Sequence, residues 1–303
     1  FFKKFFDISK KTDDEVLDIC HKVGLDIAVN LTGYTADSRN EIYQKRIAPV
    51  QISFVGYSGS MGVDFIDYII ADKCLIPKEK FKYYTEKVIY MPDSFFPNQS
   101  KIKISSKNFT KKNLNLPQNN FIFGSFNNSY KITPKIFRTW MKILNRTSNS
   151  VLWLLNNNDK ATENLIKTSE SYNVDPKRLI FAEKLPYDEH LKRFDKMDLF
   201  LDTFPYNAHT TASEAIRREV PIITMMGESF ASRVCGSLLN SIGMKDLITM
   251  DLIAYENLAV KIANNKKIYN ELKKKIKSAN SKKLFNSKYY TKNLEELFIK
   301  ILN

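Results

Sequence analysis

The stretch Met197–Thr224, MDLFLDTFPYNAHTTASEAIRREVPIIT, carries the clearest structural signal in this chain. It predicts a buried strand, a loop, a helix that opens on His209-Thr210-Thr211, and a second strand. A helix that begins with hydroxyl side chains and open backbone N–H groups is a favourable site for an anion. The segment therefore predicts a bound phosphate, and with it a nucleotide or a nucleotide sugar, next to one of the three histidines of the chain.

Strand and helix candidates alternate through the second half of the sequence. Apolar runs predict strands at 121–126, 151–155, 178–182, 198–202, 221–224 and 247–249, with helices at 134–145, 161–172, 187–195, 211–218 and 229–242. This order predicts a doubly wound parallel sheet, because parallel neighbours need crossover connections and the helices supply them. Such sheets bind ligands at the carboxyl ends of their strands.

The first half shows a similar, shorter pattern. Strands are expected at 26–31, 50–55, 66–71 and 87–91, and a helix at 13–21. The polar stretch that follows contains several prolines and predicts a linker. We therefore expect a partial Rossmann-like domain at 1–92, a linker at 93–118, a ligand-binding Rossmann-like domain at 119–282 and a tail helix within 283–303, with a cleft between the domains.

Composition narrows the class of protein. The 303 residues carry a net charge of +14, but the lysines are scattered, which favours a solvated surface over a nucleic-acid partner. The three cysteines are far apart, which argues against a disulfide framework or a zinc site and favours the reducing cytoplasm. No apolar run reaches the roughly 20 residues that span a bilayer, so no membrane is expected.

The segment Gly124–Lys131, GSFNNSYK, follows the first strand of the second domain. Thr133 fits a helix N-cap and Pro134 fits the first helical position. Lys131 is therefore expected at the carboxyl end of a strand, just before a helix start, where an ammonium group can neutralise a phosphate. The alternative is an ordinary surface lysine in a lysine-rich chain.

Two further helices carry candidate ligand contacts. Thr210 or Thr211 is expected to cap the helix at 211–218, and Thr211–Glu214 matches a capping box. Glu214 therefore closes its own helix, accepts hydrogen bonds from a ribose, or does both. His190 and Arg193 are three residues apart and share a helical face, so they either contact a nucleobase or belong to a solvated amphipathic helix.

The glycine-rich loop Val55–Gly62 matches neither the dinucleotide fingerprint nor a Walker P-loop. We expect it to let the backbone approach a ligand. The sequence also contains no HExxH motif, no CxxC pair and no DxD at a strand end. Because a metal-dependent transferase would need carboxylate or histidine ligands, the sequence predicts metal-independent chemistry without a cofactor.

These motifs resemble the catalytic region of the protein O-GlcNAc transferases and of the SPINDLY-type protein O-fucosyltransferases. The resemblance is colinear over nearly the whole chain. It is carried by DIAVNLTGYTADSRNEI, RIAPVQISFVGYSGSMGVDFIDYIIAD, FGSFNNSYKITPKIFRTWMKIL, SVLWLL, MDLFLDTFPYNAHTTASEAI, GESFASRV and LFNSKYYTKNLEELF. It implies an α/β fold of the GT-B type, with two Rossmann-like doubly wound domains facing a cleft, the first of them truncated.

The resemblance also implies roles for single residues. Lys131 matches a catalytic lysine that stabilises the departing diphosphate, and His209, Thr210 and Thr211 match a helix start that holds phosphates. The remaining matches concern the rest of the nucleotide sugar: Glu214 at the ribose, His190 and Arg193 near the base, Asn128 and Tyr130 beside the lysine, and Gly56 facing the sugar from the first domain.

The implied reaction is an inverting transfer of GlcNAc from UDP-GlcNAc to Ser or Thr of an acceptor protein. GDP-fucose is the alternative donor, and a non-catalytic interaction module is the alternative from another functional class. Family members carry upstream tetratricopeptide repeats and an additional start to the first Rossmann domain. This chain begins with FFKKFF rather than with methionine, so we expect it to be a fragment that is inactive alone.

Overall fold

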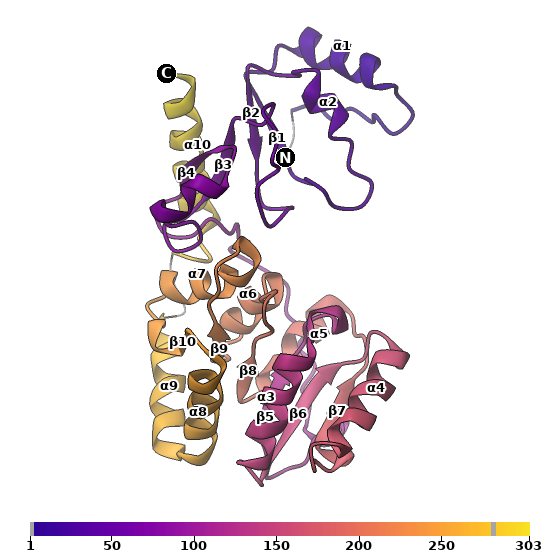
Figure 1. The fold of residues 1–303 in the computed structure, drawn as a ribbon, viewed down its shortest axis with the longest axis vertical. Coiled ribbons are helices and arrows are strands. Elements are labelled where there is room, and N and C mark those ends of the chain that lie inside the picture. The colour runs from indigo at the N-terminus through magenta and orange to yellow at the C-terminus, as the bar shows by residue number, and fades with distance from the viewer. Residues whose placement is uncertain (1–2, 280–282) are drawn as a thin grey trace. The chain divides into compact units, whose positions relative to one another are not determined.

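A computed structural model describes residues 3–279 and 283–303. The chain folds into two compact units, Phe1–Phe96 with Lys288–Asn303, and Pro97–Ser287 (Figure 1). This division differs from the expected one in two respects. Residues 97–118, expected as a linker, belong to the second unit, and the last helix, α10 (Ser287–Leu302), joins the first unit instead of forming a separate tail.

The first unit is built on four parallel strands in the order β1-β2-β3-β4. Their bounds are β1 (Ile27–Asn30), β2 (Val50–Ser53), β3 (Tyr68–Ala71) and β4 (Lys87–Tyr90). Side chains alternate between the two faces of a strand. Accordingly, Ala28 packs toward α1 (Asp13–Val23) and α2 (Glu41–Gln44), whereas Ile27 and Val29 pack toward α10.

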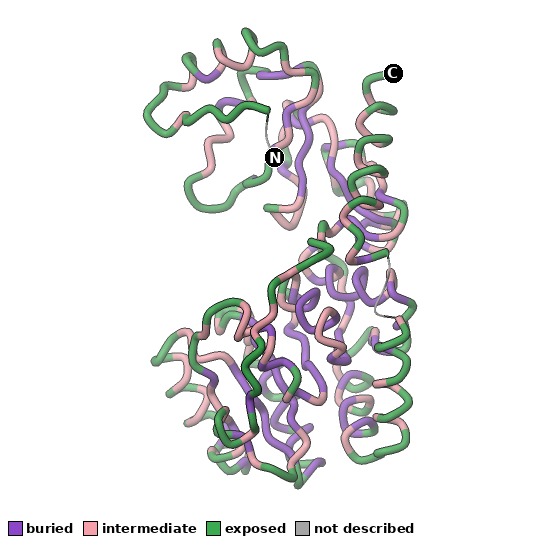
Figure 2. The backbone as a smooth tube through the Cα atoms, turned by 180° about the vertical axis from the view of Figure 1, so that it is seen from behind, coloured by how far each residue is buried: buried purple, intermediate pink, exposed green. Residues whose placement is uncertain are grey.

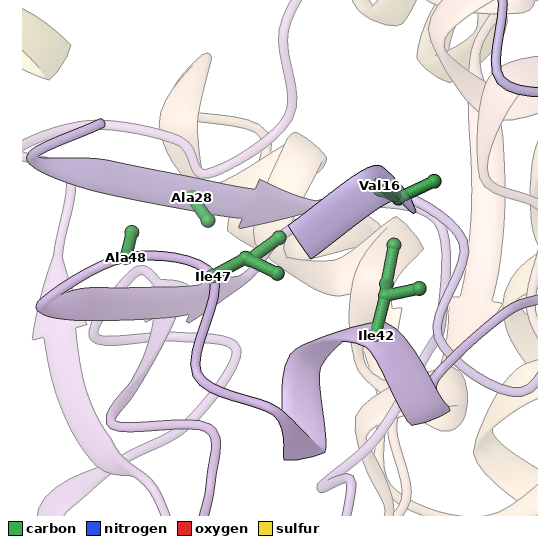
Figure 3. Packing of buried hydrophobic residues seen from close by; sticks show 5 residues of the cluster. All are labelled: Val16, Ala28, Ile42, Ile47 and Ala48. Atoms are coloured by element: carbon green, nitrogen blue, oxygen red, sulfur yellow. The ribbon is translucent and has the colours of Figure 1, made fainter. Parts of the chain in front are cut away.

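The α1 side of this sheet has a small core of its own. Figure 3 shows Val16 of α1, Ile42 of α2 and Ile47 together with Ala28 and Ala48, and these five buried side chains form one cluster. Helix α1 begins at Asp13, as expected, and acidic residues fill its first turn. Thr12 and Glu15 form a reciprocal capping box at this start.

Helix α10 covers the opposite face with an apolar stripe. Tyr290, Leu294, Leu297, Phe298 and Ile301 pack on the cluster around Ile52 and Ile70. Two tyrosine hydroxyls anchor its start: Tyr289 donates to Asp93 Oδ2 and Tyr290 to the Phe95 carbonyl, each at 2.6 Å. These contacts join residues almost 200 positions apart in the sequence. Local sequence patterns contain no sign of such contacts, so they predicted a separate tail helix.

The second unit contains a parallel sheet of six strands in the order β10-β9-β8-β5-β6-β7. The strands are β5 (Phe121–Ser125), β6 (Ser150–Leu155), β7 (Leu179–Ala182), β8 (Leu199–Leu201), β9 (Ile222–Met225) and β10 (Ile248–Thr249). The chain winds outward from β5 to β7, then returns to β8 and winds the other way. This is the predicted doubly wound topology, and its switch point lies between β5 and β8.

Helices connect these strands and bury them. They are α3 (Pro134–Asn145), α4 (Asp159–Glu170), α5 (Tyr187–Arg193), α6 (Thr210–Arg217), α7 (Val234–Ser241), α8 (Leu252–Asn264) and α9 (Lys266–Ala279). Short 3-10 helices are η1 (Lys78–Tyr83), η2 (Lys112–Leu114), η3 (Ser129–Lys131), η4 (Pro176–Arg178), η5 (Phe194–Lys196), η6 (Phe230–Ser232) and η7 (Lys245–Leu247).

The central strands of the second unit are buried on both faces, as their continuous apolar runs predict (Figure 2). Phe123, Leu152, Phe200 and Ile223 have no exposed surface. Burial of each such side chain contributes roughly 1.5–3 kcal/mol to stability. Among the described residues, none of the helices is long and apolar enough to cross a membrane.

Helix boundaries follow capping residues where the sequence supplies them. Helix α3 begins at Pro134 with Thr133 as its N-cap, as predicted. Helix α4 begins two residues earlier than expected, because the Asn158 side chain accepts a hydrogen bond from the Ala161 N–H and caps it. The helix expected at 229–242 is divided into η6 and α7.

Candidate functional site

Two loops meet at the switch point of the second sheet. One follows β5 and leads into α3, and the other follows β8 and leads into α6. Three hydrogen bonds join them: Asn127 Nδ2 to Thr203 Oγ1 (3.0 Å), Lys131 Nζ to the Asn207 carbonyl (2.9 Å) and Thr133 Oγ1 to the Phe204 carbonyl (3.0 Å). The loop after β5 and the loop after β8, which the sequence marks as separate motifs, are therefore joined in one site.

Lys131 lies at the centre of this junction. Its ammonium group is 3.8 Å from the centroid of the Tyr206 ring and uses one of its three donors on the Asn207 carbonyl. Burial lowers the pKa of Lys131 from 10.5 to about 8, and the negative charge of Asp202 opposes this effect. The group remains mostly protonated at neutral pH, so the loop junction holds a partly desolvated cation that an anion would stabilise.

Asp202 organises the loop after β8. It is buried, and its carboxylate accepts hydrogen bonds from Thr224 Oγ1 (2.6 Å) and from the N–H groups of Thr203 (2.8 Å) and Ala208 (2.6 Å). Burial raises the pKa of Asp202 to about 6, although these hydrogen bonds act in the opposite direction. The Tyr255 hydroxyl of α8 donates to the Asp202 carbonyl at 2.9 Å and ties the loop to the core.

The start of α6 differs from the sequence prediction. Its N-cap is His209, and no side chain caps it, so neither Thr210 nor Thr211 is the cap. The predicted capping box is also wrong, because Glu214 is the fifth residue of α6 and its side chain faces α5. A first turn without a side-chain cap leaves backbone N–H groups for an anion.

His209 is held as a neutral ring beside the Lys131 cation. Its Nε2 donates to the Ala231 carbonyl at 3.4 Å, and its ring centroid is 5.0 Å from that of Tyr206. Burial, and then the charge of Lys131, lower the pKa of His209 to about 3, and the hydrogen bond to Ala231 opposes them. The site therefore combines a cationic lysine, a neutral histidine and a helix start.

A second cluster joins α5 to α6. His190 Nε2 is 3.6 Å from Glu214 Oε2. Burial, and then the nearby charge of Glu214, raise the pKa of Tyr187 to about 12. Glu214 is only 8% exposed. Of the two readings that the sequence leaves open for Glu214, the structure excludes the capping box and places the carboxylate one helical turn beyond His209, on the same helix as the anion-binding start.

Arg193 occupies a different place from the one expected. Its side chain is 1% exposed and lies beneath His190, with Nη1 donating to the Glu183 carbonyl at 2.6 Å and Nη2 facing His190 Nδ1. The guanidinium also lies over the Phe126 ring, 4.5 Å from its centroid. His190, with 16% of its side chain exposed, is thus the more accessible member of the pair.

Of the remaining candidates, Asn128 and Tyr130 lie at the edge of the site, and Gly56 lies in the other unit. Asn128 Oδ1 accepts a hydrogen bond from Asn157 Nδ2 at 2.8 Å, and Tyr130 is 69% exposed. Gly56 belongs to the first unit, where a Cβ atom on it would come within 1.6 Å of the Leu31 carbonyl oxygen. Close packing of two backbone segments therefore explains a glycine at this position.

Sequence reasoning missed four residues that shape the site: Asp202, Tyr206, Asn207 and Tyr187. An aspartate at the end of an apolar strand is the one local signal that could have identified Asp202. Asn207 is fully buried, and its Oδ1 atom has no hydrogen-bond partner. Residues 3–279 and 283–303 contain no group of three or more His, Cys, Asp or Glu side chains that could hold a metal ion.

Comparison with known proteins shows which family this chain resembles. The profile described as glycosyl transferase family 41 matches residues 2–108 and 98–294. "Probable UDP-N-acetylglucosamine--peptide N-acetylglucosaminyltransferase SEC" of Arabidopsis thaliana is 34% identical over 306 residues, covering 99% of this chain and 31% of that protein. "Probable UDP-N-acetylglucosamine--peptide N-acetylglucosaminyltransferase SPINDLY" of Oryza sativa subsp. japonica is 30% identical over 298 residues, covering 96% of this chain and 32% of that protein.

A solved structure shares the fold of this chain. The protein described as "Thermobaculum terrenum O-GlcNAc transferase mutant - K341M" superimposes with a TM-score of 0.87 at 23% identity, over 99% of this chain and 57% of that one. The match confirms the predicted GT-B type α/β fold. The chain spans about a third of the length of the curated relatives it matches. On the evidence of the sequence profile and of these relatives, the chain belongs to glycosyl transferase family 41.

Proposed function

We propose that the protein transfers N-acetylglucosamine from UDP-GlcNAc to Ser or Thr side chains of an acceptor protein. The observation that carries this proposal is the pairing of the Lys131 ammonium with the side-chain-uncapped start of α6 at the sheet switch point. Relatives whose names state UDP-N-acetylglucosamine as donor and a peptide as acceptor support it.

The chemistry follows from where charge develops. The acceptor hydroxyl attacks the anomeric carbon and releases its proton to solvent. The bond from that carbon to the β-phosphate oxygen breaks, and UDP departs with the electron pair of this bond as additional negative charge. A cation and a helix start that already point at this position stabilise the transition state more than the ground state. Because Lys131 and the α6 N–H groups supply this stabilisation, we propose metal-independent, inverting transfer without a cofactor.

The second cluster suits the rest of the nucleotide. The Glu214 carboxylate is one turn along α6 from the proposed phosphate position, so it can accept hydrogen bonds from ribose hydroxyls. The partly exposed His190 ring, framed by Phe126 and Phe194, offers a surface for a nucleobase. Both roles are proposals about the same bound nucleotide.

The donor proposal favours UDP-GlcNAc over GDP-fucose. The relatives called SPINDLY, which motivate the fucose alternative, also carry UDP-N-acetylglucosamine in their descriptive names. We further propose that the protein acts in the cytoplasm, with upstream tetratricopeptide repeats and an acceptor protein as partners. None of its three cysteines forms a disulfide, in keeping with a reducing compartment.

Transfer of labelled GlcNAc to a protein acceptor tests the proposal. A full-length protein that contains this chain is expected to label an acceptor from UDP-GlcNAc, and the same protein with Lys131→Ala is expected to lose about 10²–10³ in turnover while it retains its fold. Equal turnover in the two proteins would remove Lys131 from the mechanism. Binding of neither UDP nor GDP would instead favour a non-catalytic interaction module.

A further inference from the structure

His190 is held in a fixed orientation by two aromatic rings. Its ring centroid is 5.4 Å from that of Phe126 and 5.2 Å from that of Phe194, with the Phe194 ring nearly perpendicular at 87°. In this orientation Nε2 points toward Glu214 Oε2, and Nδ1 points toward the Arg193 guanidinium. The two nitrogens of one ring thus face a carboxylate and a cation.

Arg193 is a rigid neighbour for the Nδ1 atom. It is 1% exposed, and its guanidinium is fixed by the Glu183 carbonyl on one side and by the Phe126 ring on the other. A guanidinium group can donate hydrogen bonds but cannot accept them. The Nη2···Nδ1 contact therefore requires a lone pair on Nδ1, which leaves the ring hydrogen on Nε2, the nitrogen that faces Glu214.

We propose that Arg193 is a positioning residue that acts through His190 and aims the His190 Nε2–H at the Glu214 carboxylate. With the other tautomer, two lone pairs would face each other between His190 and Glu214, and two hydrogens would face each other between His190 and Arg193. The inference rests on the proposed function for its consequence, which is that Glu214 is oriented before it meets the ribose. Orientation before binding lowers the entropy lost when the ligand is captured.

The Glu214 carboxylate lies close to the first turn of α5 in this arrangement. Its charge contributes, after burial, to the raised pKa of Tyr187, the first residue of α5. His190 faces the carboxylate from the next turn of the same helix. Helix α5 thus places a histidine donor against one acidic side chain of α6, and the buried Arg193 fixes that histidine from behind.

Nuclear magnetic resonance of the histidine rings tests the inference directly. The chain has three histidines, His21, His190 and His209, so the spectrum of the 303-residue protein labelled with ¹⁵N-histidine is simple, and loss of a signal in His190→Gln assigns His190. We expect the ring hydrogen of His190 on Nε2. A ring hydrogen on Nδ1 in the unmodified protein would overturn the proposal without any variant at Arg193.

Arg193→Lys tests the positioning effect, because lysine keeps the charge but cannot reach the Glu183 carbonyl and Nδ1 together in the planar geometry of arginine. We expect the single Nε2–H tautomer to be lost and the Kd for UDP to rise about tenfold, as for one charge-assisted hydrogen bond. Arg138→Lys, on the exposed side of α3, is the control and should change neither.

The outcomes separate this inference from the proposed function. An unchanged tautomer in Arg193→Lys, or a changed tautomer with an unchanged Kd for UDP, would overturn the positioning role. Failure of the unmodified protein to bind UDP would contradict the proposed function, whereas the tautomer of His190 would still decide which hydrogen-bonding pattern Arg193 imposes.

Discussion

Lys131→Met is expected to make the protein more stable and at the same time inactive. The folded protein lowers the pKa of Lys131 from 10.5 to about 8, chiefly by burial. One pKa unit corresponds to roughly 1.4 kcal/mol, so burial of the ammonium group opposes folding by about 3 kcal/mol. The substitution removes this cost, but it also removes the hydrogen bond to the Asn207 carbonyl and the contact with Tyr206, and their loss offsets about 1–2 kcal/mol of the gain in stability.

Methionine has nearly the length of lysine and suits a partly apolar site. We therefore expect the free energy of unfolding at pH 7, measured with urea in the absence of nucleotide, to rise by about 1–2 kcal/mol. The exposed Lys135, in the first turn of α3, provides the matched control: Lys135→Met should stay within roughly 0.5 kcal/mol of the parent. Turnover should fall only in Lys131→Met.

The pH dependence supplies an independent check on the same residue. Between pH 8 and 10.5 the unfolded state retains a proton that folded Lys131 has lost, so unfolding becomes less favourable as the pH rises through this window. The Lys131→Met protein should lack this rise. The alkaline limb of kcat/KM in the active protein should fall near pH 8. A variant destabilised by more than about 1 kcal/mol would refute the reasoning.

Three further predictions concern other parts of the chain. The pKa of His209 is lowered from 6.5 to about 3, so the unfolded state binds an additional proton below pH 6.5. The free energy of unfolding, measured with urea, should therefore be up to about 2 kcal/mol lower at pH 5 than at pH 7, and His209→Gln should remove this difference. An equal decrease in that variant would contradict the assignment. Glu214→Gln should raise the Kd for UDP by roughly 10- to 100-fold in calorimetry, whereas Glu163→Gln at an exposed ion pair should not, and equal affinities would exclude Glu214 from the ribose site. Leu297→Ala on the packed face of α10 should lower the free energy of unfolding by about 1–3 kcal/mol, and the more exposed Leu302→Ala by less; no difference would argue against the packing of α10.

Local chemistry in the sequence predicted the scaffold well. The continuous apolar runs identified every strand of the second sheet, and Thr133-Pro134 identified the start of α3, because these signals depend on residues that are neighbours in sequence. The alternation of strands and helices also predicted a parallel sheet. In such a sheet all strands end at the same edge, and at this edge Lys131 meets the loop before α6.

Non-local contacts account for what the sequence did not predict. The pattern Thr211–Glu214 fits a capping box locally, but Glu214 is oriented by His190 from another helix. Arg193 has the spacing of a surface residue, yet it is buried by the Glu183 carbonyl, just after β7, and by the Phe126 ring, just after β5. Helix α10 packs on a sheet more than 190 residues earlier in the chain, and a local pattern contains no information about such a contact.

Calorimetric titration of the 303-residue chain with UDP and with GDP tests the central claim most directly. We expect UDP to bind with at least tenfold higher affinity than GDP, and Lys131→Met to weaken UDP binding while Lys135→Met does not. Stabilisation against unfolding should follow, by about 2.7 kcal/mol at a UDP concentration of 100 times Kd. Absence of UDP binding, tighter binding of GDP, or equal UDP affinity in Lys131→Met would contradict the account.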